Sequence, residues 1–216
     1  MTASTYPTLK DESKCVTGKC MSFDGNDYIQ VVESNVSTSP LAITGAMTLS
    51  SWVKFNVLGT TRTIITRGFM AGDGNYGYGL GTHSADNNRI RFVIYAPNGS
   101  WVILHSLKTL DTNWHLITAT WDGTMNENGM KMYIDGVLDN QRASTVSTIG
   151  QPNHTFKIGR NNSSLDGLID DVRVYNGAIS ASQIKQEYIA GLNSLIANNN
   201  ISKEEYDQRL NSLSFK

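Results

Sequence analysis

The carboxylate side chains are the first candidates for chemistry in this sequence. It has 19 acidic residues, and Glu33 and Glu127 are the only glutamates between residues 19 and 179. A retaining glycosidase holds two carboxyl groups about 5 Å apart, and no Glu-x-Asp-x-x-Glu pattern places such a pair on one strand. There is no Gly-x-Ser-x-Gly motif, and the four histidines have no evident Ser or Cys partner. We therefore expect no catalytic residues and no enzyme activity.

Aromatic and amide side chains offer a second kind of chemistry, the binding of sugars. Aromatic rings stack on the apolar faces of pyranose rings, while Asn, Asp or Arg side chains bind the hydroxyl groups. The residues that could form such a platform are Arg67, Tyr76, Tyr78, Trp101, Asn161 and Asn162. Trp52, Trp114 and Trp121 lie in alternating runs and are expected in the core. Trp101 follows a turn and is expected at the surface, as is Tyr76.

The elements that must position these residues are short strands. From about residue 19 to 175, β-prone runs of alternating polarity are separated by Gly, Asn and Asp clusters. The predicted strands are 21–23, 28–32, 47–55, 63–67, 76–82, 89–95, 100–106, 114–121, 130–134, 137–143, 156–158 and 170–175. So many short strands predict an all-β fold, a two-sheet antiparallel β-sandwich or jelly roll. Asp135-Gly136 and Asn98-Gly99 each predict a type I′ hairpin turn.

After Asn176 the pattern becomes helical. Ser180 with Gln183, and Ser202 with Glu205, form two capping boxes, each followed by apolar residues at helical spacing. Residues 180–216 therefore predict a C-terminal helical hairpin. Two interpretations stay open: the helices pack on their own sandwich, or they expose apolar side chains as a linker or self-association surface.

The composition of the chain indicates which classes of partner it can bind and whether it lies inside or outside the cell. Eighteen basic residues against 19 acidic ones give a net charge of −1, so we expect no nucleic-acid partner. No apolar run approaches the 18 residues of a membrane span. Cys15 and Cys20 enclose four residues that one turn can fold back, which predicts a local disulfide and an extracellular or cell-surface location. Because residues 1–4 do not resemble a signal peptide, we expect an export signal that was trimmed or lies upstream.

Several motifs in order resemble the laminin-G-like or concanavalin-A-like jelly rolls, in particular the pentraxin-like form of bacterial and archaeal surface proteins. They lie between about residues 19 and 188. The motifs are Phe-Asp-Gly at 23–25, Trp-Val at 52–53, Trp-His at 114–115, Trp-Asp-Gly at 121–123, Tyr-Ile-Asp-Gly at 133–136 and the run from 165 to 176. The resemblance implies three parts: an N-terminal extension at 1–18, the jelly roll at 19–179 and a helical appendage at 180–216.

The resemblance also implies a function and a metal. Such domains are recognition modules, so we expect a lectin-like or adhesive domain whose partner is a glycan or a cell-surface protein. The alternative is a structural or protein-interaction tip that binds no sugar. Related jelly rolls bind a structural Ca²⁺ between an early segment and the closing strand, which makes Asp24 and Asp170 the expected ligands. Asp24 and Asp27 could instead shape their turn through hydrogen bonds to the backbone.

Overall fold

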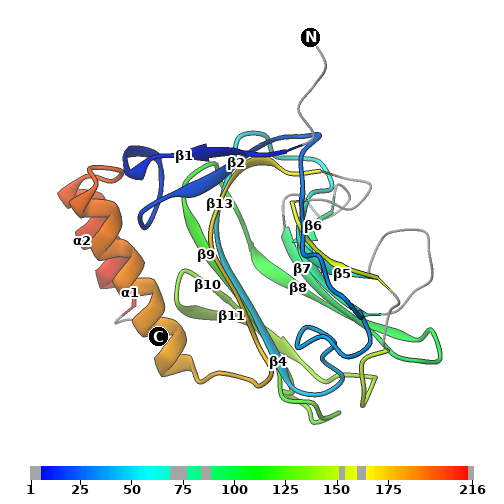
Figure 1. Cartoon of the computed structure of the whole chain (residues 1–216). Coiled ribbons are helices and arrows are strands. Elements are labelled where there is room, and N and C mark those ends of the chain that lie inside the picture. The colour runs from blue at the N-terminus through cyan, green and yellow to red at the C-terminus, as the bar shows by residue number, and fades with distance from the viewer. Residues whose placement is uncertain (1–5, 69–76, 84–88, 151–153, 160–163, 214–216) are drawn as a thin grey trace.

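The computed structural model describes residues 6–68, 77–83, 89–150, 154–159 and 164–213, which form two antiparallel sheets and two helices (Figure 1). In spatial order, the seven-stranded sheet contains β1 (Thr8–Lys10), β2 (Cys20–Asp24), β13 (Asp166–Tyr175), β4 (Met47–Phe55), β9 (His115–Trp121), β10 (Met130–Ile134) and β11 (Val137–Arg142). The six-stranded sheet contains β3 (Ile29–Gln30), β12 (Phe156–Ile158), β5 (Thr63–Arg67), β6 (Gly77–Thr82), β7 (Arg89–Tyr95) and β8 (Trp101–Thr109). The chain is therefore a two-sheet antiparallel β-sandwich with C-terminal helices, as predicted.

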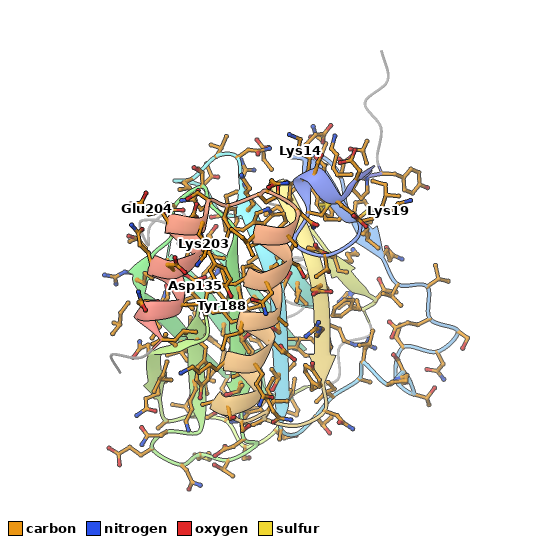
Figure 2. The ribbon with its side chains drawn as sticks, turned by 90° about the vertical axis from the view of Figure 1, so that its left-hand side faces the viewer. Lys14, Lys19, Asp135, Tyr188, Lys203 and Glu204 are labelled. Carbon is orange, nitrogen blue, oxygen red and sulfur yellow. A yellow bond between two sulfur atoms is a disulfide. The ribbon has the colours of Figure 1, made fainter. Side chains whose placement is uncertain are left out.

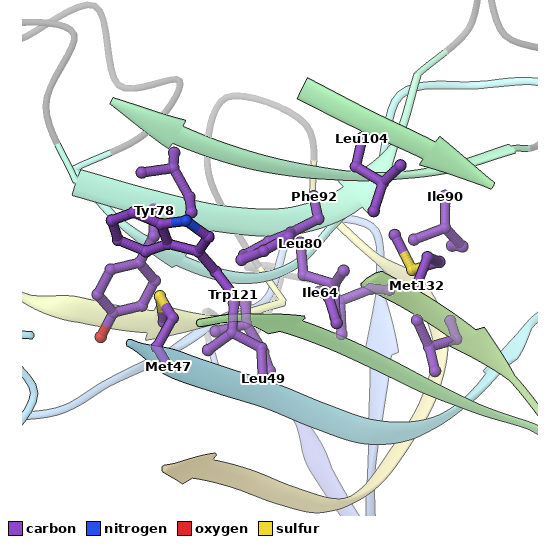
Figure 3. Packing of buried hydrophobic residues seen from close by; sticks show 14 of the residues in the cluster. Met47, Leu49, Ile64, Tyr78, Leu80, Ile90, Phe92, Leu104, Trp121 and Met132 are labelled. Carbon is purple, nitrogen blue, oxygen red and sulfur yellow. The ribbon is translucent and has the colours of Figure 1, made fainter. Parts of the chain in front are cut away.

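The main core lies between the two sheets, where alternate residues of each strand meet (Figure 3). Trp121 of β9 is fully buried there, and its indole Nε1 donates a hydrogen bond of 2.9 Å to the Thr124 carbonyl oxygen. Met47 on one sheet and Phe92 on the other are also fully buried. Each such side chain stabilises the fold by about 1.5–3 kcal/mol relative to exposure.

Five strands, namely β4, β5, β7, β10 and β12, have the predicted bounds. Strands β3, β8 and β13 differ from the prediction by two or more residues at an end, and β1 was not predicted. Strand β3 is only Ile29–Gln30, although its contact with β12 continues in a hydrogen bond of 2.9 Å from Val31 N to the Phe156 carbonyl oxygen. Strand β13 begins at Asp166, four residues before the predicted start. Its second residue, Gly167, suggests a turn, but the β4 backbone passes so close that a Cβ there would lie 2.2 Å from the Lys54 carbonyl oxygen.

The two predicted hairpin turns have different geometries. Asp135 and Gly136 both have positive φ, 56° and 77°, which confirms the type I′ turn between β10 and β11. The prediction of the same turn at Asn98-Gly99 is wrong, since only Gly99 there has positive φ. Pro97, whose ring fixes a negative φ, begins a three-residue loop closed by a hydrogen bond from Ala96 N to the Ser100 carbonyl oxygen.

Two helices, α1 (Ala181–Ala197) and α2 (Lys203–Ser212), cover the outer face of the seven-stranded sheet (Figures 1 and 2). Ser180 and Gln183 form the predicted capping box of α1. The Tyr188 ring of α1 stacks on Trp52 of β4, with centroids 5.5 Å apart and planes inclined by 17°. A Cβ on Gly191 would lie 2.4 Å from the Trp52 ring. Of the two interpretations of the appendage, the structure has the helices packed on their own sandwich.

A disulfide between Cys15 and Cys20 closes a loop beside β2, as predicted. The Asp170 Oδ2 atom accepts hydrogen bonds of 2.9 Å from the backbone N–H groups of Val16 and Thr17 within this loop. The Asn200 side chain, between the two helices, donates to the Cys15 carbonyl oxygen at 2.8 Å. The loop thereby joins the N-terminal segment to the closing strand β13 and to the helical appendage.

Candidate functional site

The first residue of β8, Trp101, lies at a corner of the six-stranded sheet. Its side chain is 55 % exposed, although most large aromatic residues of the described chain are buried. Tyr95 is its antiparallel neighbour on β7, and the two rings lie 6.0 Å apart at 37°. The short loop that joins the two strands is braced by Asn98, whose Oδ1 accepts hydrogen bonds from the backbone and hydroxyl of Ser100. The two rings therefore form a bent aromatic surface on a short, hydrogen-bonded hairpin.

The free edge of β8 is covered by side chains of β11 and of the segment that follows it. Thr145 Oγ1 donates to the Trp101 carbonyl oxygen at 3.3 Å, Arg142 Nη1 to that of Ile103 at 2.7 Å, and Asn140 Nδ2 to that of His105 at 2.8 Å. These contacts satisfy backbone groups that an edge strand otherwise leaves open to another chain. They also fix the backbone that carries Trp101.

Two of the six predicted sugar-binding residues are buried and cannot contact a ligand at the surface. Arg67 and Tyr78 point into the sandwich, because the β5 and β6 positions that pair them face the core. The guanidinium of Arg67 binds the Glu33 carboxylate at 2.7 Å, and the Tyr78 hydroxyl donates to the Leu41 carbonyl oxygen at 2.8 Å. Both side chains anchor the segment that follows β3. Assigning them to the platform was therefore wrong.

Of the other four, only Trp101 lies among the described residues, and it is exposed as expected. Tyr76, Asn161 and Asn162 lie outside them. Tyr95 is the residue that sequence reasoning missed. Pro97 is the signal that could have identified it, because a three-residue loop beginning there places Tyr95 opposite Trp101.

The structure does not bring Asp24 and Asp170 together as a Ca²⁺ site. Asp24 pairs with Asp166 at the start of β13, and Asp170 lies four residues further along, roughly 13 Å away at the usual strand rise. Asp24 Oδ1 instead accepts from the Asn26 N–H at 2.9 Å, the turn-shaping alternative. Asp170 is buried, which raises its pKa, and its carboxylate holds the disulfide loop. The described residues contain no group of three His, Cys, Asp or Glu side chains arranged to hold a metal.

A second cluster, which the sequence analysis did not predict, lies near the helices. The His115 ring is held between two carboxylates, with Nδ1 2.9 Å from Asp135 and Nε2 3.0 Å from Asp111. Lys108 Nζ also binds Asp135, at 2.8 Å. Burial by itself lowers the pKa of His115, but the two carboxylates outweigh it and raise the pKa above its usual value. Because ionised carboxylates only accept hydrogen bonds, this geometry fits an imidazolium that donates from both nitrogens.

This cluster lies at one side of a polar groove of about 720 Å³ between α2 and the β10–β11 hairpin. Asp135 of the hairpin and Tyr188 of α1 both line this groove, and Figure 2 shows them close together. Arg209 of α2 donates to the Trp114 carbonyl oxygen at 2.8 Å and to Glu205 at 2.7 Å. Most of the charged side chains along the groove are therefore paired with one another. The contact of Arg209 with the Trp114 carbonyl oxygen joins the helical appendage to the sandwich.

Comparison with known proteins identifies the family. The two antiparallel sheets and their strand order define a concanavalin A-like jelly roll. Residues 23–185 match the family model described as the concanavalin A-like lectin/glucanases superfamily, a laminin-G-like family, and the chain belongs to that family. The match runs from Phe23 on β2 into the first turn of α1. No curated protein matches the sequence.

Several solved structures share the fold of this chain. Domain 4 of AbnA, a GH43 extracellular arabinanase from Geobacillus stearothermophilus in complex with arabinotriose, aligns with a TM-score of 0.64 at 22% identity over 85% of this chain and 81% of that one. The binding domain of Paraclostridial Mosquitocidal Protein 1 gives 0.65 at 15% identity, covering 88% and 47%. The receptor binding domain of botulinum neurotoxin D gives 0.61 at 19%, covering 86% and 46%. This chain thus spans about half the length of the two toxin domains. Similarity at these identities establishes a common fold.

No helix among the described residues has the length and apolar character needed to cross a bilayer.

Proposed function

We propose that this domain is a non-catalytic recognition module that binds carbohydrate outside the cell, with Trp101 and Tyr95 as its stacking platform. The observation that carries the proposal is the 55 % exposure of Trp101 on a backbone fixed by a braced hairpin and by Thr145. An aromatic side chain presented on a rigid element has little conformational freedom left to lose on binding. Such rings suit the apolar faces of sugars.

Two further observations support the proposal. A neighbour with the same fold, domain 4 of the arabinanase, was solved with arabinotriose bound. The Cys15–Cys20 disulfide fits an oxidising, extracellular setting. Self-association through the helices receives less support, since Tyr188, Leu192 and Leu195 lie buried against the sandwich of the same chain. A protein ligand at Trp101 remains the alternative, because exposed tryptophans are also frequent at protein interfaces.

A glycan array tests the proposal. The chain is applied with Ca²⁺ and, in parallel, with a chelator, alongside the variants Trp101→Ala and Leu9→Ala. Leu9 is the matched control, because it is 58 % exposed on β1, at the opposite edge of the seven-stranded sheet from β11. Removing a central aromatic anchor costs about 2 kcal/mol or more, so we expect Trp101→Ala to weaken sugar binding at least roughly 30-fold.

Three results would change the assignment. If Trp101→Ala binds sugars as well as the unmodified chain, the platform lies elsewhere. If the unmodified chain binds none of the glycans, a protein partner becomes the preferred function. A loss of binding in chelator, with the protein still folded, would establish a cation requirement that the pair Asp24 and Asp170 does not explain.

A further inference from the structure

The two sheets of the sandwich differ in charge. The six strands β3, β12, β5, β6, β7 and β8 contain no Asp or Glu, but they contain five Lys and Arg residues. Two of those cations have carboxylate partners from outside the sheet, Arg67 with Glu33 and Lys108 with Asp135. The strands of the other sheet contain five Asp residues, four of them on β2 and β13, together with five Lys and Arg residues. The strands of the six-stranded sheet therefore place no carboxylate beside Trp101, while their own cations are buried, as Arg67 and Arg91 are, or lie away from it, as Lys108 does seven residues along β8.

Arg142 brings a further guanidinium to the corner where Trp101 lies. Its Nη1 donates to the Ile103 carbonyl oxygen at 2.7 Å and its Nε to that of Ala143 at 3.3 Å. Ile103 is two residues from Trp101, roughly 7 Å along β8. The contact therefore holds the Arg142 guanidinium close enough to the exposed Trp101 indole for one disaccharide to reach both.

This guanidinium keeps donors available for a ligand. An arginine carries five N–H donors, and the two contacts with backbone carbonyls use only two of them. Arg142 is exposed, and none of the described carboxylates lies within 4.0 Å of it. Arg173 and Arg209, by contrast, are both paired with glutamates. A guanidinium held by carbonyls and left without an acidic partner suits a carboxylate or sulfate group.

We propose that the saccharide bound at Trp101 is anionic, and that Arg142 binds its uronate carboxylate or sulfate ester. This inference rests on the proposed function, because it concerns the same site. The indole supplies contact area to any sugar ring, whereas the guanidinium selects the acidic one. Trp101 thus determines whether a saccharide binds, and Arg142 determines which class of saccharide is preferred.

Calorimetric titration with paired probes tests the inference. The pairs are oligogalacturonate and its methyl ester, sulfated galactan oligosaccharide and its desulfated form, and sialyllactose and lactose. Each is titrated against the unmodified chain, Arg142→Gln and Lys131→Gln. Lys131 is the control: it lies on β10, paired with Gln141 next to Arg142, so its substitution removes one positive charge from the same part of the same sheet and leaves the Arg142 guanidinium in place. One charge-assisted hydrogen bond at an exposed site gives roughly a ten-fold preference for the acidic member, which Arg142→Gln removes and Lys131→Gln does not.

The outcomes separate this inference from the proposed function. If acidic and neutral members bind equally and Trp101→Ala abolishes both, the anionic preference is wrong and sugar binding at Trp101 stands. If none of the probes binds, both proposals fail. The pair that shows the preference distinguishes carboxylate from sulfate. A salt titration of the unmodified chain gives a test that needs no variant, because raising ionic strength from about 0.05 M to about 0.5 M should weaken only acidic ligands.

Discussion

Trp52 and Trp101 occupy equivalent kinds of position on opposite outer faces of the sandwich, and only one of them is exposed. Both side chains point away from the main core, because strand alternation directs their neighbours inward. Trp52 is 1 % exposed beneath Tyr188 of α1, whereas Trp101 is 55 % exposed beside Tyr95. The helices turn one outer face into a second core, and the other face keeps a corner aromatic surface open. What covers a strand decides whether its outward tryptophan stabilises the fold or can bind a ligand.

The largest effect is expected at the covered face. Trp52→Ala removes a buried ring that contacts Tyr188 and Gly191, and leaves a cavity between helix and sheet. Truncation of a buried aromatic of this size costs about 3–5 kcal/mol. Urea unfolding followed by far-ultraviolet circular dichroism measures the free energy of unfolding. A loss below about 1 kcal/mol would mean that the helices contribute little to the stability of the sandwich.

The disulfide loop gives the next effect, because it ties the appendage to the sheet. The double variant Cys15→Ser/Cys20→Ser opens a short loop, which should lower the free energy of unfolding by about 2 kcal/mol. The loop also receives a hydrogen bond from Asn200 between the helices. Hydrogen exchange should therefore rise in residues 198–202 as well as 15–20, and exchange confined to residues 15–20 would contradict this coupling.

The ionic cluster at the covered face predicts a pH dependence. The pKa of His115 is raised in the folded state, so its stabilising contribution is complete below its unfolded pKa of about 6.5 and is lost as pH rises through the folded pKa. A neutral ring donates from one nitrogen, so its bond to the exposed Asp111 is weakened at a cost of about 1 kcal/mol. The free energy of unfolding of the unmodified chain should therefore fall between pH 6 and pH 9. The fall should be about 1 kcal/mol larger than the fall in the His115→Gln variant.

The pKa values of Asp111 and Asp135 are both lowered in the folded state, although burial by itself raises them. The two carboxylates therefore stabilise the fold above their unfolded pKa values, and this stabilisation is lost as pH falls through the lowered pKa values of the folded state. That loss occurs at a pH well below the range from 6 to 9 in which His115 is tested. If the free energy of unfolding falls by the same amount between pH 6 and pH 9 in His115→Gln as in the unmodified chain, a group other than His115 titrates in this range.

Local patterns in the sequence predicted most of the fold. The bounds of β4, β5, β7, β10 and β12 were predicted to the residue, because each β-prone run ends at or beside Gly, Asn, Asp or Pro residues that mark a turn. The capping box at Ser180 marked the start of α1 for a similar local reason. The start of β13 and the turn type at Asn98-Gly99 were mispredicted, because the close approach of the β4 backbone at Gly167 and the preceding Pro97 decide the local geometry.

The candidate site was less predictable, since exposure depends on contacts between distant segments. Arg67 and Tyr78 have suitable chemistry for a sugar site, but their register directs them to Glu33 and Leu41 inside the sandwich. The partnership of Trp101 with Tyr95 depends on the three-residue loop that begins at Pro97, because the predicted two-residue turn would place Val102 opposite Tyr95. The role of Arg142 was also out of reach of the sequence, because its contact with Ile103 joins strands of two different sheets.

The smallest effect on stability is expected at the exposed corner, and it completes the comparison of the two tryptophans. Trp101→Ala removes a side chain whose ring is largely in water, while the backbone contact with Thr145 stays. Its free energy of unfolding should therefore change by no more than about 0.5 kcal/mol, against the several kcal/mol expected for Trp52→Ala. Urea unfolding of the two variants, measured side by side, makes this comparison. A loss of more than about 1.5 kcal/mol in Trp101→Ala would make the indole a structural part of the hairpin, and its effect on sugar binding would then have to be separated from unfolding.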